Sequence, residues 1–265
     1  MKVIFNDPSK VNPPSIQPLV EGSKLQQMLS IDLCEEERMH YLYTLKGFPT
    51  LFIGSYHKIT GISAVQHHIN LKERNKPVVQ RLRWLGVIQQ DALLSEVRKL
   101  LQAGFIYLVE DSKWVSPMVV TPKKNGKWWV CVDYKPLDAA TKGDHFPLPF
   151  QDEILNEVVG YECYTVCDDY SGYFQIRIAE EDQRRTTFVK PWGCFAYRVM
   201  PFSLTNAPAT FQRYVTVTHA FQPFFDKSIR VFIDDFCIYS SQCTPIPLVK
   251  CIPCILIKSP PAFAL

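Results

Sequence analysis

The sequence predicts an α+β fold in which an antiparallel sheet is backed by helices, and three observations carry this prediction. Hydrophobic residues make up 47% of the 265 residues, which is enough to form a real core. Runs rich in Val, Ile, Phe and Tyr are joined by tight-turn residues, as expected for antiparallel strands. Segments with helical spacing are intermixed with these runs instead of alternating strictly with them, which favours an α+β architecture.

Three helices are predicted from apolar spacing and terminal residues. In the first, which begins near Gln89, apolar residues recur every three or four positions up to Gly104, a typical C-terminal cap. The second covers about Phe150–Val159 and is closed by Gly160. The third runs from about 205 to 220, with a polar capping residue before an early Pro.

Strand-like runs lie between these helices and after the last of them. The predicted strands cover 116–121, 127–134, 162–168, 173–178, 186–190, 195–200 and the two arms of 231–240. The first two are joined by Lys123-Lys124-Asn125-Gly126, whose Asn-Gly pair is a strong hairpin signal. This hairpin therefore has a basic tip.

The ends of the chain differ in composition from its middle. We expect residues 1–78 to be a weakly structured connecting segment, with one weak helical pattern over 39–52, and residues 79–240 to form the main folded part. Residues 241–265 form a tail that contains Pro and Cys. There Cys251 and Cys254 have a zinc-like spacing, but without a second pair or a nearby His two free thiols are favoured.

Composition limits the classes of partner. A net charge of +3 and a pI of about 8.3 permit a nucleic-acid partner without arguing for one. Nine cysteines at irregular spacings, with no secretory signal, indicate reduced thiols. No run approaches the roughly 20 apolar residues that a membrane span needs. We therefore expect an intracellular chain with no membrane partner, in either the cytoplasm or the nucleus.

Two neighbouring acids stand inside an apolar stretch. Residues 231–240, VFIDDFCIYS, contain Asp234 and Asp235, and burying unpaired carboxylates costs several kcal/mol or forces protonation. A tight turn between Ile233 and Phe236 would let both side chains point the same way. Taken alone, the pair could equally be a solvated and inert hairpin tip.

A second acidic strand end favours a metal site. Residues 164–173, YTVCDDYSGY, carry Asp168 and Asp169 and continue into Ser171-Gly172, a turn whose backbone amides could cradle an anion. Two strands thus each end in acid. Clustered carboxylates become favourable when divalent cations such as Mg²⁺ neutralise them, and such ions keep coordination positions for substrate phosphates.

These motifs together resemble the reverse transcriptase of gypsy-type long-terminal-repeat retrotransposons, especially the plant elements. The likeness covers residues 76–240 and extends weakly upstream to 57–63. The matching runs are KPVVQR (76–81), WVSP (114–117), CVDY (131–134), DHFPLPF (144–150), SGY with QI (171–176), MPF (200–202), LTNAPATFQ (204–212) and the Asp-Asp hairpin.

The resemblance implies a right-hand polymerase with fingers and palm, the thumb being absent after the acidic hairpin. Asp168, Asp234 and Asp235 would be the catalytic residues and would hold two Mg²⁺ ions, with Mn²⁺ as a substitute. The implied activity is that of an RNA-directed DNA polymerase acting on a primed RNA or DNA template with deoxynucleoside triphosphates. Other parts of a polyprotein, or a second chain, are the remaining partners.

The same resemblance assigns nucleotide-binding roles to a further set of residues. These are Lys123, Lys124, Ser171, Gly172, Tyr173 and Phe202. One of the two lysines would meet the γ-phosphate, the Ser-Gly backbone would lie near the triphosphate, and the two aromatic rings would pack under the sugar and the nucleotide. From residue types alone, Tyr173 would be an ordinary strand aromatic, Phe202 a core residue and the lysines a solvated tip.

Several positions depart from the family pattern. Trp129 stands where the family has Arg, Ser203 where it has Gly, Asp138 where it has Asn and Phe232 where it has Tyr or Met. Losing a guanidinium removes bidentate charge-assisted bonds to phosphate. Two other functions therefore stay open: an inactive relic that at most binds nucleic acid, and a metal-dependent nuclease using the same acids.

Overall fold

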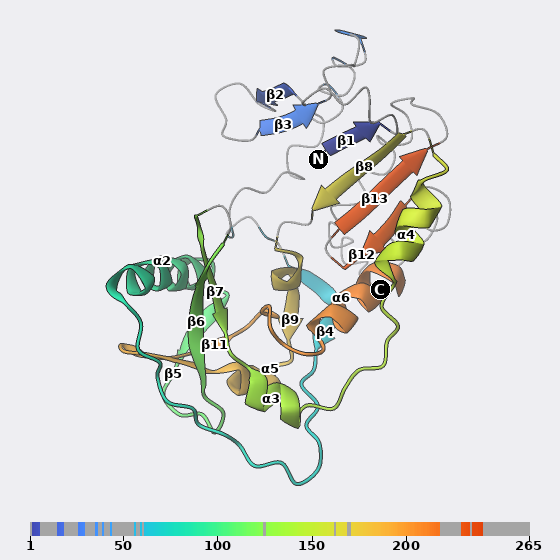
Figure 1. The fold of residues 1–265 in the computed structure, drawn as a ribbon. Helices are drawn as coiled ribbons and strands as arrows, with labels where there is room; N and C mark the ends of the chain where they lie inside the picture. The colour runs from blue at the N-terminus through green and yellow to red at the C-terminus, as the bar shows by residue number, and fades with distance from the viewer. Residues whose placement is uncertain are drawn as a thin grey trace, which may run out of the picture. The chain divides into compact units, whose positions relative to one another are not determined.

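The computed structural model describes residues 2–5, 15–18, 26–29, 61–123, 126–161, 163–168, 171–217, 229–233 and 235–240, together with 35, 36, 39, 43, 56 and 59. These residues belong to two compact units, and each unit is described by itself (Figure 1). The first unit comprises 1–54, 146–170 and 212–258. The second unit comprises 55–145, 171–211 and 259–265.

An antiparallel sheet with the strand order β1-β8-β13-β12 forms the centre of the first unit (Figure 1). Its strands are β1 (Lys2–Phe5), β8 (Cys163–Asp168), β12 (Ile229–Phe232) and β13 (Asp235–Ser240). A separate hairpin is made by β2 (Ser15–Pro18) and β3 (Gln26–Leu29). Helix α4 (Gln151–Val158) lies beside β12, where the Arg230 guanidinium pairs with the Glu157 carboxylate. Alternate residues of β12 are buried, as expected for a strand with one face on the core.

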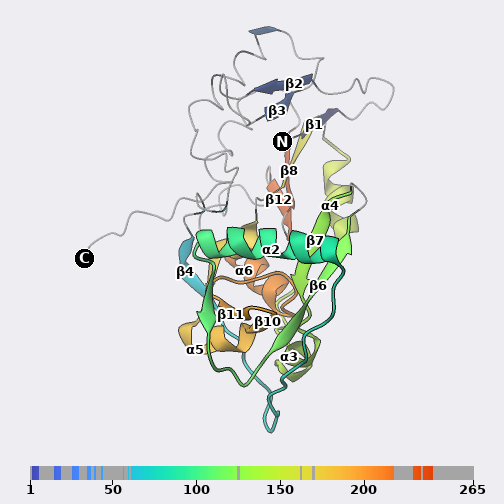
Figure 2. The same cartoon turned by 90° about the vertical axis from the view of Figure 1, so that its left-hand side faces the viewer.

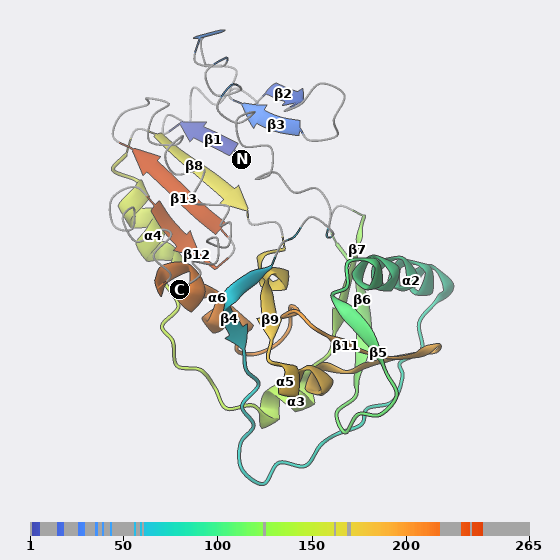
Figure 3. The same cartoon turned by 180° about the vertical axis from the view of Figure 1, so that it is seen from behind.

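A five-stranded sheet of order β5-β11-β10-β6-β7 forms the second unit. Its strands are β5 (Ile106–Val109), β6 (Ser116–Pro122), β7 (Trp128–Val132), β10 (Phe188–Lys190) and β11 (Gly193–Tyr197). Strands β4 (Ile62–His67) and β9 (Ile176–Ile178) form a separate parallel pair and lie side by side in Figure 3. Short helical segments complete the unit: α3 (Lys135–Ala140), η4 (Gly172–Gln175), α5 (Glu180–Gln183) and η5 (Arg184–Thr186).

Helix α2 (Val87–Gln102) covers the five-stranded sheet (Figure 2). Its buried residues are Leu93, Val97 and Leu100, which share one helix face at the predicted spacing. Gly104 follows the helix with a φ of +73°, the left-handed conformation that favours glycine. Among the described residues, every helix is too short or too polar to cross a membrane.

Most predicted elements are confirmed by the structure. The predicted helices correspond to α2, α4 and α6 (Ala207–Val217), and the basic hairpin corresponds to β6 and β7. Residues 207–211 of α6 belong to the second unit and 212–217 to the first. Only positions 39 and 43 of the weak helical pattern over 39–52 are described, and both are helical. The tail at 241–265, with Cys251 and Cys254, lies outside the described residues.

Three details differ from the predictions. The strand expected over 173–178 begins only at Ile176, because the residues before it form the 3₁₀ turn η4. Two strand pairs, β10 with β6 and β4 with β9, are parallel, where an antiparallel sheet was expected. The polar residue expected to cap α6 is engaged elsewhere: the Asn206 side chain accepts a hydrogen bond from the Asp144 N–H and donates one to the Lys142 carbonyl.

Candidate active site

The acidic hairpin is formed by β12 and β13. Phe232 pairs with Asp235 in the register, so the loop between the strands consists of positions 233 and 234. The turn predicted between Ile233 and Phe236 is therefore one residue too late, and Asp235 is the first residue of β13 instead of a turn residue. Its side chain is exposed. Asp234 itself lies outside the described residues.

The register between β8 and β13 brings two predicted acids to the same place in the sheet. Asp168, the last residue of β8, stands directly opposite Asp235, the first residue of β13. Residues opposite each other across an antiparallel pair are the closest cross-strand neighbours. The two positions are 67 residues apart along the chain, and the sheet alone makes them neighbours.

A buried amide supports the loop that precedes the acids. Ile233 has a φ of +55°, which is a genuine outlier for a β-branched residue. Its N–H donates a 3.0 Å hydrogen bond to Oε1 of Gln212, and Nε2 of Gln212 donates a 3.3 Å bond to the Val231 carbonyl. Only 2% of Gln212 is exposed.

Sequence reasoning assigned no role to Gln212. In the sequence it is the last residue of the LTNAPATFQ run, which gives it no predicted role. The signal that could have identified it is a polar amide among the buried residues of α6, where Phe211, Tyr214 and Val215 are apolar. A polar side chain in such a position needs hydrogen-bond partners, and the hairpin supplies them.

In the second unit, the Ser171-Gly172 pair forms a strained turn. Ser171 has φ +56° and ψ +44°, a left-handed conformation that is uncommon for residues other than Gly. Its carbonyl accepts a 2.9 Å hydrogen bond from the Phe174 N–H, which begins η4. Gly172 is buried at the start of this turn.

The two aromatic residues predicted at the nucleotide contact each other. The ring centroids of Tyr173 and Phe202 are 4.7 Å apart in an edge-to-face arrangement. The Phe211 ring also packs against Tyr173, with a centroid distance of 5.2 Å. Tyr173 is 5% exposed, whereas Phe202 is half-buried. Of this pair, only Phe202 offers substantial surface to a ligand.

The basic hairpin carries an exposed aromatic ring. The Lys123 ammonium lies 5.9 Å from the centre of the Trp129 ring, and 51% of Trp129 is exposed. The Gly126 N–H donates to the Lys123 carbonyl with a φ of +76° at Gly126, which closes the hairpin. Lys124 lies outside the described residues. The tip therefore presents a cation and an indole at the position where the resemblance expects a guanidinium.

Two of the other departures from the family pattern meet around one turn. Ser203 is exposed and has a φ of +81°, the region that favours the Gly expected there. Burial raises the pKa of the Cys131 thiol, and a hydrogen bond with the Ser203 side chain opposes this shift. Asp138 accepts a 2.9 Å bond from the Thr205 N–H, and desolvation is the main reason that the pKa of Asp138 is raised.

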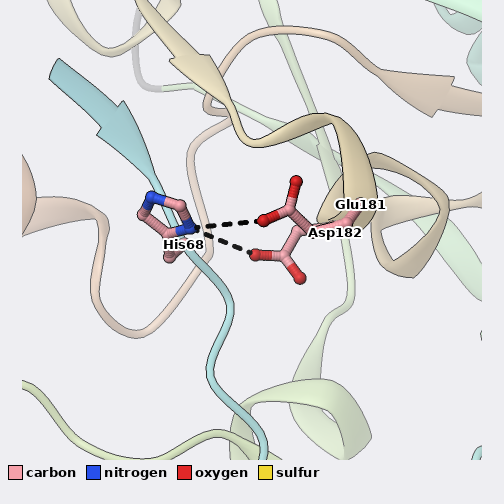
Figure 4. Close-up of side chains that lie close together, drawn as sticks. All are labelled: His68, Glu181 and Asp182. Atoms are coloured by element: carbon pink, nitrogen blue, oxygen red, sulfur yellow. Dashed lines mark ion pairs between the residues drawn. The ribbon is translucent and has the colours of Figure 1, made fainter.

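A His and two acids also come together at α5. His68 Nδ1 lies 3.9 Å from carboxylate oxygens of Glu181 and Asp182. Figure 4 shows the two carboxylates facing the His68 ring. Asp182 is already engaged, since Oδ2 accepts the Ile69 N–H at 2.8 Å and Oδ1 pairs with Arg185 at 2.5 Å. Because Arg185 neutralises the buried carboxylate, this cluster is best explained as an ion-pair network that ties α5 to the end of β4.

Comparison with known proteins identifies the family. Residues 121–256, about half of the chain, match the family model described as reverse transcriptase (RNA-dependent DNA polymerase). The retrovirus-related Pol polyprotein from transposon 297 of Drosophila melanogaster is 31% identical over 217 residues, covering 80% of this chain and 20% of that protein. The transposon Tf2-3 polyprotein of Schizosaccharomyces pombe is 29% identical over 183 residues, covering 68% of this chain and 13% of that protein. The chain thus spans only a small part of these relatives.

Solved structures agree on the fold. The foamy viral protease-reverse transcriptase in complex with an RNA/DNA hybrid aligns with a TM-score of 0.75 and 18% identity, covering 85% of this chain and 30% of that chain. The native prototype foamy virus protease-reverse transcriptase aligns with a TM-score of 0.72 at the same identity and coverage. These likenesses confirm the α+β fingers-and-palm fold, and together with the matched family model they show that the chain belongs to the reverse transcriptase (RNA-dependent DNA polymerase) family.

Proposed function

We propose that this chain is the polymerase core of a retrotransposon polyprotein, of the gypsy type and plant-like, and that it adds deoxynucleotides to a primer 3′-hydroxyl. The observation that supports this most is the register that pairs Asp168 with Asp235. In the proposal, these two residues and Asp234 are the catalytic carboxylates. An intracellular location belongs to the same proposal, with the cytoplasm and the nucleus as the two alternatives.

The acidic residues fit a divalent-cation site by their chemistry. Like charges directly opposite each other across two strands are destabilising, and the exposed Asp235 carboxylate is open to ions from solution. Carboxylate oxygens are the ligands that Mg²⁺ prefers, and members of the family generally use divalent metal ions. Mg²⁺, or Mn²⁺ in its place, would then be held by Asp168, Asp234 and Asp235.

The work of the protein in this reaction is mainly to position the reactants. Metal ions at the acids would make the primer 3′-hydroxyl a better nucleophile and would offset the charge of the leaving pyrophosphate. The β12–β13 hairpin fixes the position of Asp235 opposite the end of β8. The exposed part of Phe202 would pack against the nucleotide, with the buried Tyr173 ring supporting it from the side.

Charged and turn residues of the second unit would hold the triphosphate. The Lys123 ammonium is exposed at the hairpin tip, with Lys124 next to it in sequence, and one of the two would meet the γ-phosphate as a point charge. The Ser171-Gly172 turn has the left-handed geometry from which backbone N–H groups can converge on an anion. The template and primer are proposed partners, as are other parts of a polyprotein or a second chain.

Primer extension tests the proposal. The purified chain would be incubated with poly-rA/oligo-dT, dTTP and Mg²⁺, beside a variant with Asp234→Ala and Asp235→Ala. We expect incorporation by the chain and none by the variant. If incorporation survives in the variant, our assignment of the carboxylates is wrong.

One observation favours a second function, that of an inactive relic which only binds nucleic acid. Trp129 replaces the expected Arg, and an indole cannot donate two charge-assisted bonds to phosphate. Absence of incorporation by the unmodified chain, combined with salt-dependent binding of the primed template, would establish this alternative. Cleavage of the template without incorporation would instead indicate the nuclease, which no feature beyond the acids favours.

A further inference from the structure

The hairpin that carries the acids lies at the edge of its sheet. Among the described residues of the first unit, β12 is a terminal strand in the order β1-β8-β13-β12. Strand β13 pairs with one side of β12, so backbone groups on the other side have no partner strand. Buried backbone groups without partners cost free energy, and β12 has buried residues at Ile229 and Val231.

The Gln212 side chain supplies what a further strand would have supplied. A primary amide carries one carbonyl and one N–H₂ group, which makes it a chemical match for a peptide unit. Its Oε1 accepts from the Ile233 N–H at 3.0 Å and its Nε2 donates to the Val231 carbonyl at 3.3 Å. The two backbone groups are two residues apart, the repeat at which a strand presents groups to one side.

The amide also holds a conformation that the sequence does not favour. Two-residue hairpin loops prefer Gly or Asn where φ is positive, yet this loop has Ile233 at +55°. The left-handed region costs an L-residue roughly 1–2 kcal/mol, and such strain persists only when surrounding structure holds it. The hydrogen bond to the Ile233 N–H is the contact that acts on the strained residue itself.

We propose that Gln212 is a positioning residue that fixes the acidic loop for divalent-cation binding. The proposal rests on the function proposed above, because the loop leads directly into Asp234 and Asp235. The Gln212 side chain acts through the backbone of residues 231–233, to which it is hydrogen-bonded. A structural role alone would predict a loss of global stability without a specific change at the hairpin.

Three variants of the full chain test this proposal. Gln212→Met keeps the length of the side chain but removes both hydrogen bonds. Gln212→Glu keeps an acceptor for the Ile233 N–H and loses the donor to Val231. Thr216→Val is the matched control on the same helix, since it removes the bond from Thr216 Oγ1 to the Gln212 carbonyl at 2.8 Å and leaves the Gln212 side chain intact.

The first measurement is hydrogen exchange of the Ile233 amide, and the second is Mn²⁺ binding followed by electron paramagnetic resonance. We expect Gln212→Met to speed Ile233 exchange and to weaken Mn²⁺ binding, each about tenfold, which corresponds to the loss of a buried hydrogen bond. Gln212→Glu should retain the protection of Ile233, and Thr216→Val should change neither quantity. Equal rates of Ile233 exchange in Gln212→Met and Thr216→Val would overturn the proposal. The proposal would also be overturned if Asp235→Asn weakens Mn²⁺ binding and Gln212→Met leaves Mn²⁺ binding unchanged.

A further variant separates positioning from simple stability. Ile233→Gly removes the strain, so a Gln212→Met change made in that background should weaken Mn²⁺ binding by less than it does in the natural chain. An equal loss in both backgrounds would refute the link between the amide and the strained loop. If Asp235→Asn leaves Mn²⁺ binding unchanged, the metal site of the proposed function fails, while Ile233 exchange still decides whether Gln212 holds the loop.

Discussion

The buried His67 should make the second unit sensitive to acid. His67, the last residue of β4, is 2% exposed, and its Nδ1 lies 2.9 Å from Thr210 Oγ1. Burial is the main reason that the pKa of His67 is lowered from 6.5 to about 4; the neighbouring His68 lowers it further, and Asp144 opposes the shift. The folded unit therefore excludes the proton that the unfolded chain takes up.

The sign and size of the effect follow from this difference. Because the unfolded chain binds more protons below pH 6.5, stability should fall as the pH drops from 6.5 to about 4. At 1.36 kcal/mol per pKa unit, the loss amounts to about 3 kcal/mol. Above pH 6.5 the residue is neutral in both states and contributes no pH dependence.

Urea unfolding followed by tryptophan fluorescence measures this loss. All five tryptophans, at positions 84, 114, 128, 129 and 192, belong to the second unit, so the signal reports on the unit that contains His67. His67→Gln cannot titrate and should show a flatter dependence on pH between 6.5 and 4. His68→Gln is the control, because His68 is half exposed, and it should keep the steep dependence. Parallel curves for the natural chain and His67→Gln would refute the reasoning.

Three more outcomes are expected with the same unfolding assay or with nucleotide binding. Ser203→Gly should stabilise the second unit by about 1 kcal/mol, since it removes the positive φ strain and loses only the bond to the Cys131 thiol; a decrease would mean that this bond outweighs the strain. Lys190→Met should stabilise the second unit at pH 7 by no more than about 5 kcal/mol, because burial lowers the pKa of Lys190 from 10.5 to about 7. As the pH rises from 7 to 10.5, the natural chain should gain stability and the Lys190→Met variant should not. Trp129→Arg should tighten dTTP binding about tenfold in titration calorimetry, whereas Trp129→Phe should not; equal affinities would show that the missing guanidinium does not matter.

The elements that the sequence predicts well are those set by local pattern. Helix α2 has its apolar positions three and four residues apart and a glycine after its end, and both features are local. The strands that carry Asp168 and Asp235 are likewise marked by β-branched and aromatic residues. Their pairing is a different matter, because the register that places the two acids opposite each other is a contact between residues far apart in the chain.

The local structures that differ from the predictions, a helix cap and a strand start, have physical explanations. A polar residue was expected to cap α6, but the side chain of Asn206, just before the helix, instead joins the 142–144 segment to the helix start, a tertiary bond that no local rule predicts. The residues at 173–175 have strand-like composition, yet the turn at Ser171 makes them a 3₁₀ segment. In the first place a tertiary contact overrides local propensity, and in the second a strained turn does so.

Backbone strain explains why local sequence rules predict these turns less well than the helices and strands. Among the described residues, four other than Gly have a positive φ; Ser171 and Ile233 lie in the motif runs that carry the resemblance, and Ser203 lies between two of these runs. Turn rules would place Gly or Asn at such positions and so shift the expected acidic turn by one residue. Each strained residue lies next to a stabilising contact: a 3₁₀ bond at Ser171, the Cys131 thiol at Ser203 and the Gln212 amide at Ile233. Because the Gln212 amide that holds Ile233 comes from another element, the geometry of the loop before the acids is a property of the folded protein and not of the local sequence.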